Sequence, residues 1–223
     1  MLLQALNDQN KVAIDELLAT EGVKDWINHR ALPEQLDNPI REFKDVKSIT
    51  CLAFASLVNE ARTVQQLIEA GADVAVTDCN GFSPLHYACA SDIDSDVKVA
   101  YLMQSGASSE TATAGSEQEA FGPEFYATSL RLAARLNQAS RVRALIDDHG
   151  ASVNATDSWG RTALHIAAKA GNTEAVQILV SDPRCDLGLR NKRGHTAAAN
   201  ARHQEHRDIA SLITSKAKGT LYC

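Results

Sequence analysis

Apolar residues in this chain form short clusters at helical spacing, and the clusters come in pairs separated by glycine or polar turns. One pair lies between Asp157 and Val180, where Gly171-Asn172 separates a first cluster at 163–168 from a second at 176–180. Apolar positions three or four residues apart are typical of helices with one buried face. A single pair leaves that face uncovered, so we expect neighbouring copies to pack against it.

The same pattern returns at a nearly constant interval. Thr50 and Ser83, which open two successive first helices, are 33 residues apart. Thr128, Thr162 and Thr196 follow at intervals of 34 residues. A fixed period of this length predicts an array of stacked repeats.

Two stretches make the pattern specific. Residues 78–88, D-C-N-G-F-S-P-L-H-Y-A, resemble the ankyrin repeat, whose common sequence is D-x-x-G-x-T-P-L-H-x-A-A. Residues 150–157, G-A-S-V-N-A-T-D, are similar to the G-A-D-V-N-A-x-D connection of that family. In this pattern Gly81 suits a tight turn, Ser83 caps the first helix, and Pro84 occupies a first-turn position where a missing N–H costs nothing.

The resemblance implies an all-α ankyrin-repeat solenoid of stacked helix–turn–helix repeats, with turn or β-hairpin fingers between them. It covers almost the whole chain, is strong at 78–88 and 150–196, and is weak before residue 20. We expect a single domain over residues 1–223. Its approximate repeats are 1–44 (incomplete, with a long loop), 45–77, 78–122 (with an insertion at 108–122), 123–156, 157–190 and 191–223 (a C-terminal cap).

Composition and charge limit the classes of protein and the cellular compartments that fit this chain. Hydrophobic residues make up 44% of the chain but aromatic ones only 5%, which favours closely packed small helices. The net charge of −6 argues against a general nucleic-acid or anionic-membrane binder. The five cysteines are scattered without a CxxC pair, the first residues do not form a Sec-type signal peptide, and no apolar run is long enough to span a membrane. We expect a cytoplasmic monomer, with the nucleus or a host cell as open alternatives.

Candidate chemistry is sparse. His86 and His165 occupy equivalent repeat positions beside a Ser or Thr, and we interpret them as structural. Cys89 follows His86 on the same helix face but fills a slot that is buried in the family, so we expect an inert core residue. Asn154 resembles the connection asparagine that oxygenases can hydroxylate in ankyrin proteins, although a bond to the turn backbone is the simpler role.

Three histidines crowd the last repeat: His195, His203 and His206. Their spacing matches no recognised zinc pattern, and no nucleotide-binding, hydrolase or kinase signature occurs. We therefore predict no cofactor, no metal and no enzymatic activity. A metal protein or enzyme that uses this histidine-rich repeat or Cys89 is the alternative, and a pure structural scaffold is a third.

The resemblance implies that a partner protein or peptide binds the concave face formed by the fingers and the first helices. Aromatic and arginine side chains often dominate binding energy, and three scarce aromatics fall at successive finger tips. The sequence therefore predicts a non-catalytic interaction module, acting as an adaptor, inhibitor or targeting domain. The predicted partner-binding residues are Phe82, Phe125, Tyr126, Trp159, Arg161, Lys169, Lys192 and Arg193.

Charge is unevenly distributed along the chain. Residues 182–223 hold eight Lys/Arg against four Asp/Glu, a net of +4, which leaves −10 for the remainder. A partner with an apolar middle and an acidic end that faces Lys192 and Arg193 would match this gradient.

Overall fold

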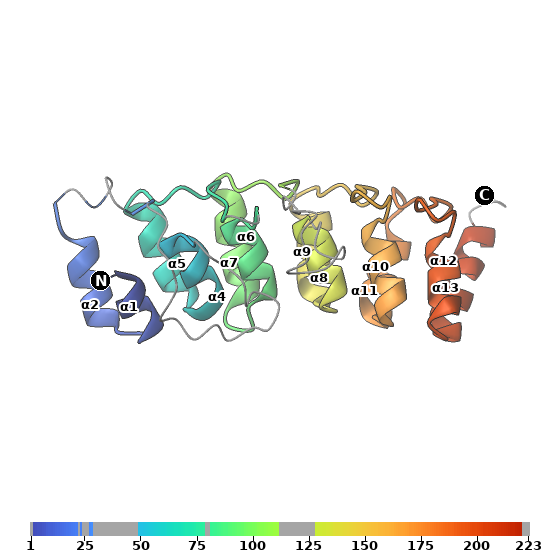
Figure 1. The fold of residues 1–223 in the computed structure, drawn as a ribbon, viewed down its shortest axis with the longest axis horizontal. Coiled ribbons are helices and arrows are strands. Elements are labelled where there is room, and N and C mark those ends of the chain that lie inside the picture. Colours follow the sequence, from blue (N-terminus) through green and yellow to red (C-terminus); the bar gives the residue numbers. More distant parts are fainter. Residues whose placement is uncertain are drawn as a thin grey trace. The chain divides into compact units, whose positions relative to one another are not determined.

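The computed structural model describes residues 2–21, 23, 27–28, 49–78, 81–111 and 128–219. The chain forms two compact units, Met1–Tyr126 and Ala127–Cys223. In the described part of each unit, helices follow one another in antiparallel pairs and no extended strand occurs (Figure 1). The expected all-α repeat architecture is therefore confirmed for each unit.

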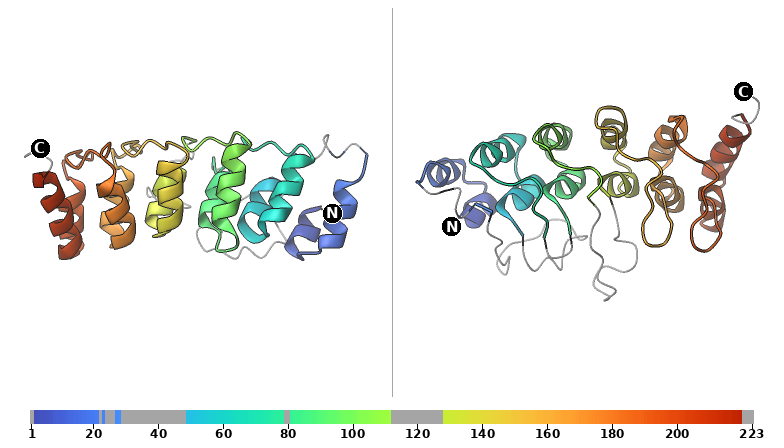
Figure 2. Two further views of the ribbon diagram at one scale, coloured as in Figure 1. Left: turned by 180° about the vertical axis from the view of Figure 1, so that it is seen from behind. Right: turned by 90° about the horizontal axis from the view of Figure 1, so that it is seen from above.

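The first unit contains the pairs α1 (Leu2–Asn7) and α2 (Lys11–Leu18), α4 (Cys51–Val58) and α5 (Ala61–Glu69), and α6 (Pro84–Ala90) and α7 (Ser95–Gln104). The second contains α8 (Ser129–Arg135) and α9 (Ala139–Asp147), α10 (Ala163–Ala170) and α11 (Thr173–Ser181), and α12 (Ala197–His203) and α13 (Arg207–Gly219). In the second unit α10 packs between α8 and α12, while α11 packs on α9 and α13 (Figure 2). The first and second helices of the pairs thus form separate layers within the unit.

Local sequence sets the helix boundaries. Thr50 accepts a hydrogen bond from the Ala53 N–H, and Asn10 does the same for Ala13, so these side chains cap the first turns of α4 and α2. Gly71 follows the C-cap of α5 with a φ of 99°, the left-handed conformation that glycine tolerates best.

Small residues let the first helices approach closely. Ala53 and Ala55 of α4 and Ala88 and Cys89 of α6 are fully buried where those two helices pack. In the second unit the same arrangement uses alanines at 133, 134, 167, 168 and 201. Small side chains therefore fill the contacts between neighbouring first helices, while Leu, Ile and Val make up most of the remaining core.

Polar side chains from inter-helix loops and second helices bind the ends of three first helices, α1, α4 and α8, in the preceding pairs. The Asn59 amide donates to the Leu6 carbonyl at the end of α1. The Asn172 amide donates to the carbonyls of Ala134 and Arg135 at the end of α8. Because the last carbonyls of a helix have no partner inside it, each of these contacts completes the preceding helix from outside.

Lys98 of α7 makes the corresponding contact for α4. Its side chain is 0% exposed, and its ammonium donates to the carbonyls of Ser56 and Asn59 and to the Ser91 hydroxyl at 2.7–3.0 Å. The C-terminal end of a helix attracts a cation, so this site suits a buried ammonium. The apolar side chain of the preceding residue, Val97, faces solvent, and this residue is 60% exposed.

Asn28 repeats in the first unit a contact that Asn154 makes in the second. The Asn28 amide donates to the Gly71 carbonyl and accepts from the Asp73 N–H. Asn154 bonds the Arg184 carbonyl and the Asp186 N–H in the same way, so it binds backbone as expected, but that of the following connection and not that of its own turn. The contact shows that a connection of the repeat type begins as early as Asn28.

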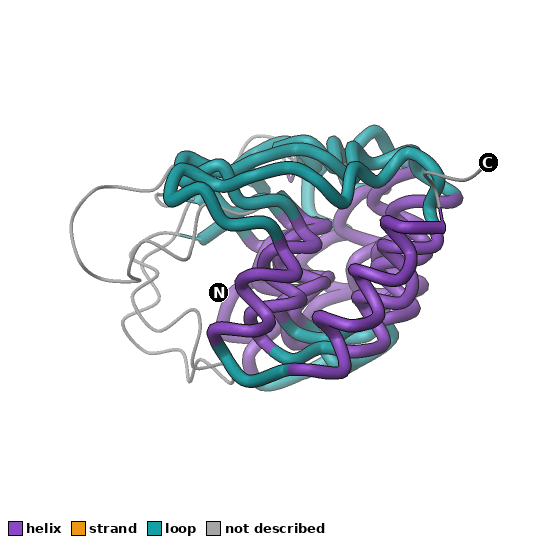
Figure 3. Tube along the Cα trace, turned by 90° about the vertical axis from the view of Figure 1, so that its right-hand side faces the viewer, coloured by secondary structure: helices purple, strands orange, loops and turns teal. Residues whose placement is uncertain are grey.

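The connections between pairs and the loops within pairs lie at opposite ends of the helices (Figure 3). Two described fingers end in one kind of turn, in which a backbone N–H bonds the carbonyl four residues later, from Asp157 to Arg161 and from Asn191 to His195. The Asp78 N–H bonds the Phe82 carbonyl in the same way. Among the described helices none is both long and apolar enough to cross a membrane.

Candidate partner-binding site

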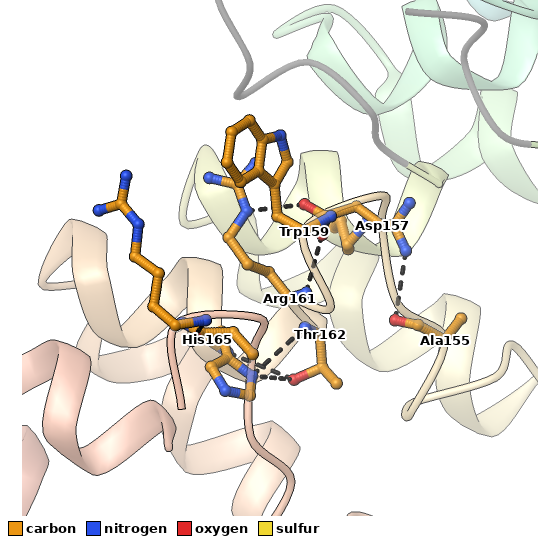
Figure 4. Close-up of polar contacts among 9 residues, drawn as sticks. Ala155, Asp157, Trp159, Arg161, Thr162 and His165 are labelled. Carbon is orange, nitrogen blue, oxygen red and sulfur yellow. Dashed lines mark hydrogen bonds and ion pairs between the residues drawn. The ribbon is translucent and has the colours of Figure 1, made fainter. Parts of the chain in front are cut away.

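The finger that ends at Asp157–Arg161 is fixed by one buried carboxylate. The Asp157 Oδ1 atom accepts from the N–H groups of Trp159 and Arg161, and Oδ2 accepts from the Arg161 Nε at 2.7 Å (Figure 4). The Asp157 side chain is almost fully buried. A carboxylate with several N–H donors is a strong anchor, so the turn has one well-defined shape.

Trp159 stands at the tip of this finger. Its side chain is 38% exposed, and its carbonyl accepts from the Lys192 N–H of the next finger. Gly160 has a φ of 70°, and an added Cβ would lie only 3.2 Å from the Lys192 nitrogen. The two finger tips are thus held together by backbone contacts, with the indole left partly open to solvent.

A capping box connects the finger to α10. The Thr162 hydroxyl lies 2.9 Å from His165 Nδ1, the same ring atom accepts from the Thr162 N–H, and His165 Nε2 lies 3.1 Å from the His195 carbonyl. Ser83 and His86 repeat the Ser/Thr–His contacts at the start of α6. The structural role expected for both histidines is confirmed.

Burial lowers the pKa of His165 below its ordinary value of 6.5, against smaller opposing effects of the His195 carbonyl and Asp157. A proton on Nδ1 would also oppose the Thr162 N–H that now points at it. The unfolded chain protonates His165 at a higher pH than the folded chain does. The contribution of neutral His165 to the free energy of unfolding is therefore fully present above pH 6.5 and is lost as the pH falls from there towards the folded-state pKa.

We therefore expect the free energy of unfolding to fall on acidification from about pH 6.5 to about pH 5, with a smaller fall in His165→Gln. Urea titrations across this range test the effect. An unchanged slope in His165→Gln would assign the pH dependence to other groups.

The structure corrects the predicted exposure of two site residues. Phe82 is 1% exposed, because its ring packs edge-on against His86 and at a tilt against Tyr87, so it offers no contact surface. The Arg161 side chain is 12% exposed and is committed to Asp157, so it acts in shaping the finger. Phe125 and Tyr126 lie outside the described residues.

The remaining predicted residues lie on the second unit. Lys192 and Arg193 are exposed on the finger next to Trp159, and Lys169 is half-buried near the end of α10. Arg190, which is not among the predicted site residues, donates from its guanidinium to the Gly194 carbonyl within the same finger. The absence of acidic residues from 187–204 could have drawn attention to it.

The histidines and cysteines within the described part of the chain do not form a metal-binding group. His195 and His203 lie ring to ring, with centroids 4.8 Å apart, but no three His, Cys, Asp or Glu side chains of the described residues form a possible metal group. Cys89 is fully buried. Burial, reinforced by Asp182 and Asp186, raises the pKa of the Cys185 thiol to about 12.

A groove that the sequence did not suggest lies between α9 and α11. Its lining mixes both charges, with Arg143 and Arg184 beside Asp147, Glu174 and Asp182. The Arg184–Asp182 ion pair holds the pKa of Asp182 below its usual value. The groove is formed by second helices and is therefore separate from the fingers.

Comparison with known proteins agrees with this geometry. The family described as "Ankyrin repeats (many copies)" matches residues 145–199, and the family "Ankyrin repeat" matches residues 126–158. The chain is 35% identical over 119 residues to the neurogenic locus notch homolog protein 1 of Xenopus tropicalis and equally to that of Xenopus laevis. These matches cover 53% of the chain and only 4% of each relative. With its helix pairs, capping boxes and finger turns, the chain is a member of the ankyrin repeat family.

Proposed function

We propose that this chain is a non-catalytic interaction module that binds a partner protein through the fingers and first helices of its second unit. Ankyrin repeats are in general protein-interaction modules. Within that class, an adaptor, an inhibitor or a targeting domain uses the same kind of surface. The histidines of the two capping boxes, His86 and His165, are occupied in holding the fold.

The observation that carries this proposal is the position of Trp159. Its indole is partly exposed while its backbone is fixed on both sides, by Asp157 through the N–H and by Lys192 through the carbonyl. A large ring held in place before binding loses little conformational freedom when a partner covers it. Tryptophan is also the residue type most enriched among interface positions that dominate affinity.

Trp159→Ala is expected to weaken partner binding by at least about thirtyfold, the effect of losing about 2 kcal/mol at a dominant contact. Wild-type and variant proteins, each immobilised at equal density, are used to capture proteins from native lysate, and the captured proteins are quantified. Val97→Ala is the matched control, because it trims a more exposed apolar side chain on α7 of the first unit.

Proteins that disappear with Trp159→Ala and remain with Val97→Ala would be the partners expected here. Circular dichroism and the urea midpoint show that both variants are folded. If the folded Trp159→Ala protein captures the same proteins with the same affinity as wild type, the proposed face is wrong.

A further inference from the structure

The finger beside Trp159 belongs to a segment without acidic residues. Residues 187–204 contain Arg190, Lys192, Arg193 and Arg202, together with His195 and His203, and no Asp or Glu. Asp186 stands just before the segment, where its Oδ1 accepts from the Gly188 N–H. The segment forms the last finger and α12, so four cationic side chains lie on consecutive parts of one repeat.

The acidic groups of this unit are mostly placed elsewhere. Asp147 and Asp148 end α9, while Glu174 and Asp208 lie in the first turns of α11 and α13. These are second helices, which form the other layer of the unit. Asp157 belongs to the finger side, but it is buried and paired with Arg161. The second-helix layer therefore carries charges of both signs, whereas the exposed charges at the tip of the last finger are Lys192 and Arg193.

Lys192 and Arg193 are the exposed end of this basic surface. The Lys192 N–H bonds the Trp159 carbonyl, which holds this charged tip directly beside the exposed indole. The Arg193 N–H and the His195 N–H both donate to Asn191 Oδ1, so the turn that carries the two charges is as well fixed as its neighbour. Cations on a fixed turn attract carboxylates without a loss of loop freedom.

We infer that the partner segment received here is acidic, with Asp or Glu side chains that face Lys192 and Arg193 and an apolar side chain against Trp159. This inference rests on the proposed function and adds the chemical class of the partner. A protein segment fits better than a nucleic acid, because residues outside 182–223 carry a net charge of −10 and would repel a long polyanion. A short acidic protein segment would contact only the finger that carries Lys192 and Arg193.

Three short peptides test the inference, identical in their apolar residues and carrying Glu, Gln or Lys at the other positions. Fluorescence anisotropy of each labelled peptide is measured with the full chain at low and high salt. The Glu peptide should bind about tenfold more tightly than the Gln peptide, equivalent to about 1.4 kcal/mol, and lose this advantage at high salt. A single-stranded oligonucleotide is measured alongside.

Lys192→Glu/Arg193→Glu should remove the advantage of the Glu peptide. Lys216→Glu/Lys218→Glu changes the net charge by the same amount on α13 and should leave it in place. Equal losses in both variants, no preference for Glu over Gln, or tighter binding of the oligonucleotide would each overturn the inference. If partners captured from lysate depend on Trp159 but not on Lys192 and Arg193, the proposed function stands and only the acidic class fails.

Discussion

Lys98→Met is expected to lower the free energy of unfolding by about 3 kcal/mol, although methionine has nearly the same volume. The substitution removes an ammonium that donates to two carbonyls and one hydroxyl in a fully buried site. The carbonyls of Ser56 and Asn59 would stay buried and lose a charged donor. Urea titration followed by circular dichroism measures the loss.

Lys11→Met is the matched control. Lys11 also pairs with an inter-helix residue, Glu60, at 2.9 Å, but both side chains are more than half exposed. Exposed pairs contribute about 0–1 kcal/mol, so the control should remain close to wild type. If Lys98→Met were neutral or stabilising, the desolvation cost of the buried ammonium would outweigh its hydrogen bonds, and its role in holding α4 would be refuted.

Asp157→Ala should cost about 2–4 kcal/mol and also abolish partner binding. The change leaves the N–H groups of Trp159 and Arg161 without their acceptor and the Arg161 guanidinium without its carboxylate. Because the same carboxylate orients the Trp159 backbone, loss of binding should exceed what the fraction of unfolded protein explains. Urea titration and capture at a temperature where the variant remains folded measure the two effects.

Asp157→Asn provides the matched comparison. Asn191 already performs this function in the next finger, where its Oδ1 accepts from Arg193 and His195. An asparagine at 157 should therefore keep the turn and lose the ion pair, at a cost of about 1 kcal/mol, with binding retained. Equal destabilisation by Asn and Ala would assign the anchor to the ion pair rather than to the turn.

Much of the fold follows from local sequence. The capping threonine at 50, the Thr162–His165 pair and the turn glycine at 71 act within a few residues, so their roles could be predicted without knowledge of neighbouring repeats. The interval of 33 to 34 residues then determines which helices pack together. The sequence interval alone is therefore enough to predict which helices pair.

The side chains that join one repeat to another could not be predicted in the same way. A charged side chain such as Lys98 is expected to face solvent when only the sequence of α7 is considered, yet it is fully buried against the end of α4. Phe82 occupies a tip position whose exposure depends on where His86 and Tyr87 place their rings. Asn28 lies far from any recognisable motif, and only its two bonds to Gly71 and Asp73 reveal its role.

The contacts that complete each first helix from the following pair have a consequence for synthesis of the protein. The end of α1 is satisfied by Asn59 and the end of α4 by Lys98, residues that leave the ribosome later than the helices they serve. At about 5–20 residues per second, each first helix waits seconds for its partner. A nascent chain paused between Val58 and Lys98 would expose the unfinished end of α4, which is then open to a chaperone until Lys98 has been added.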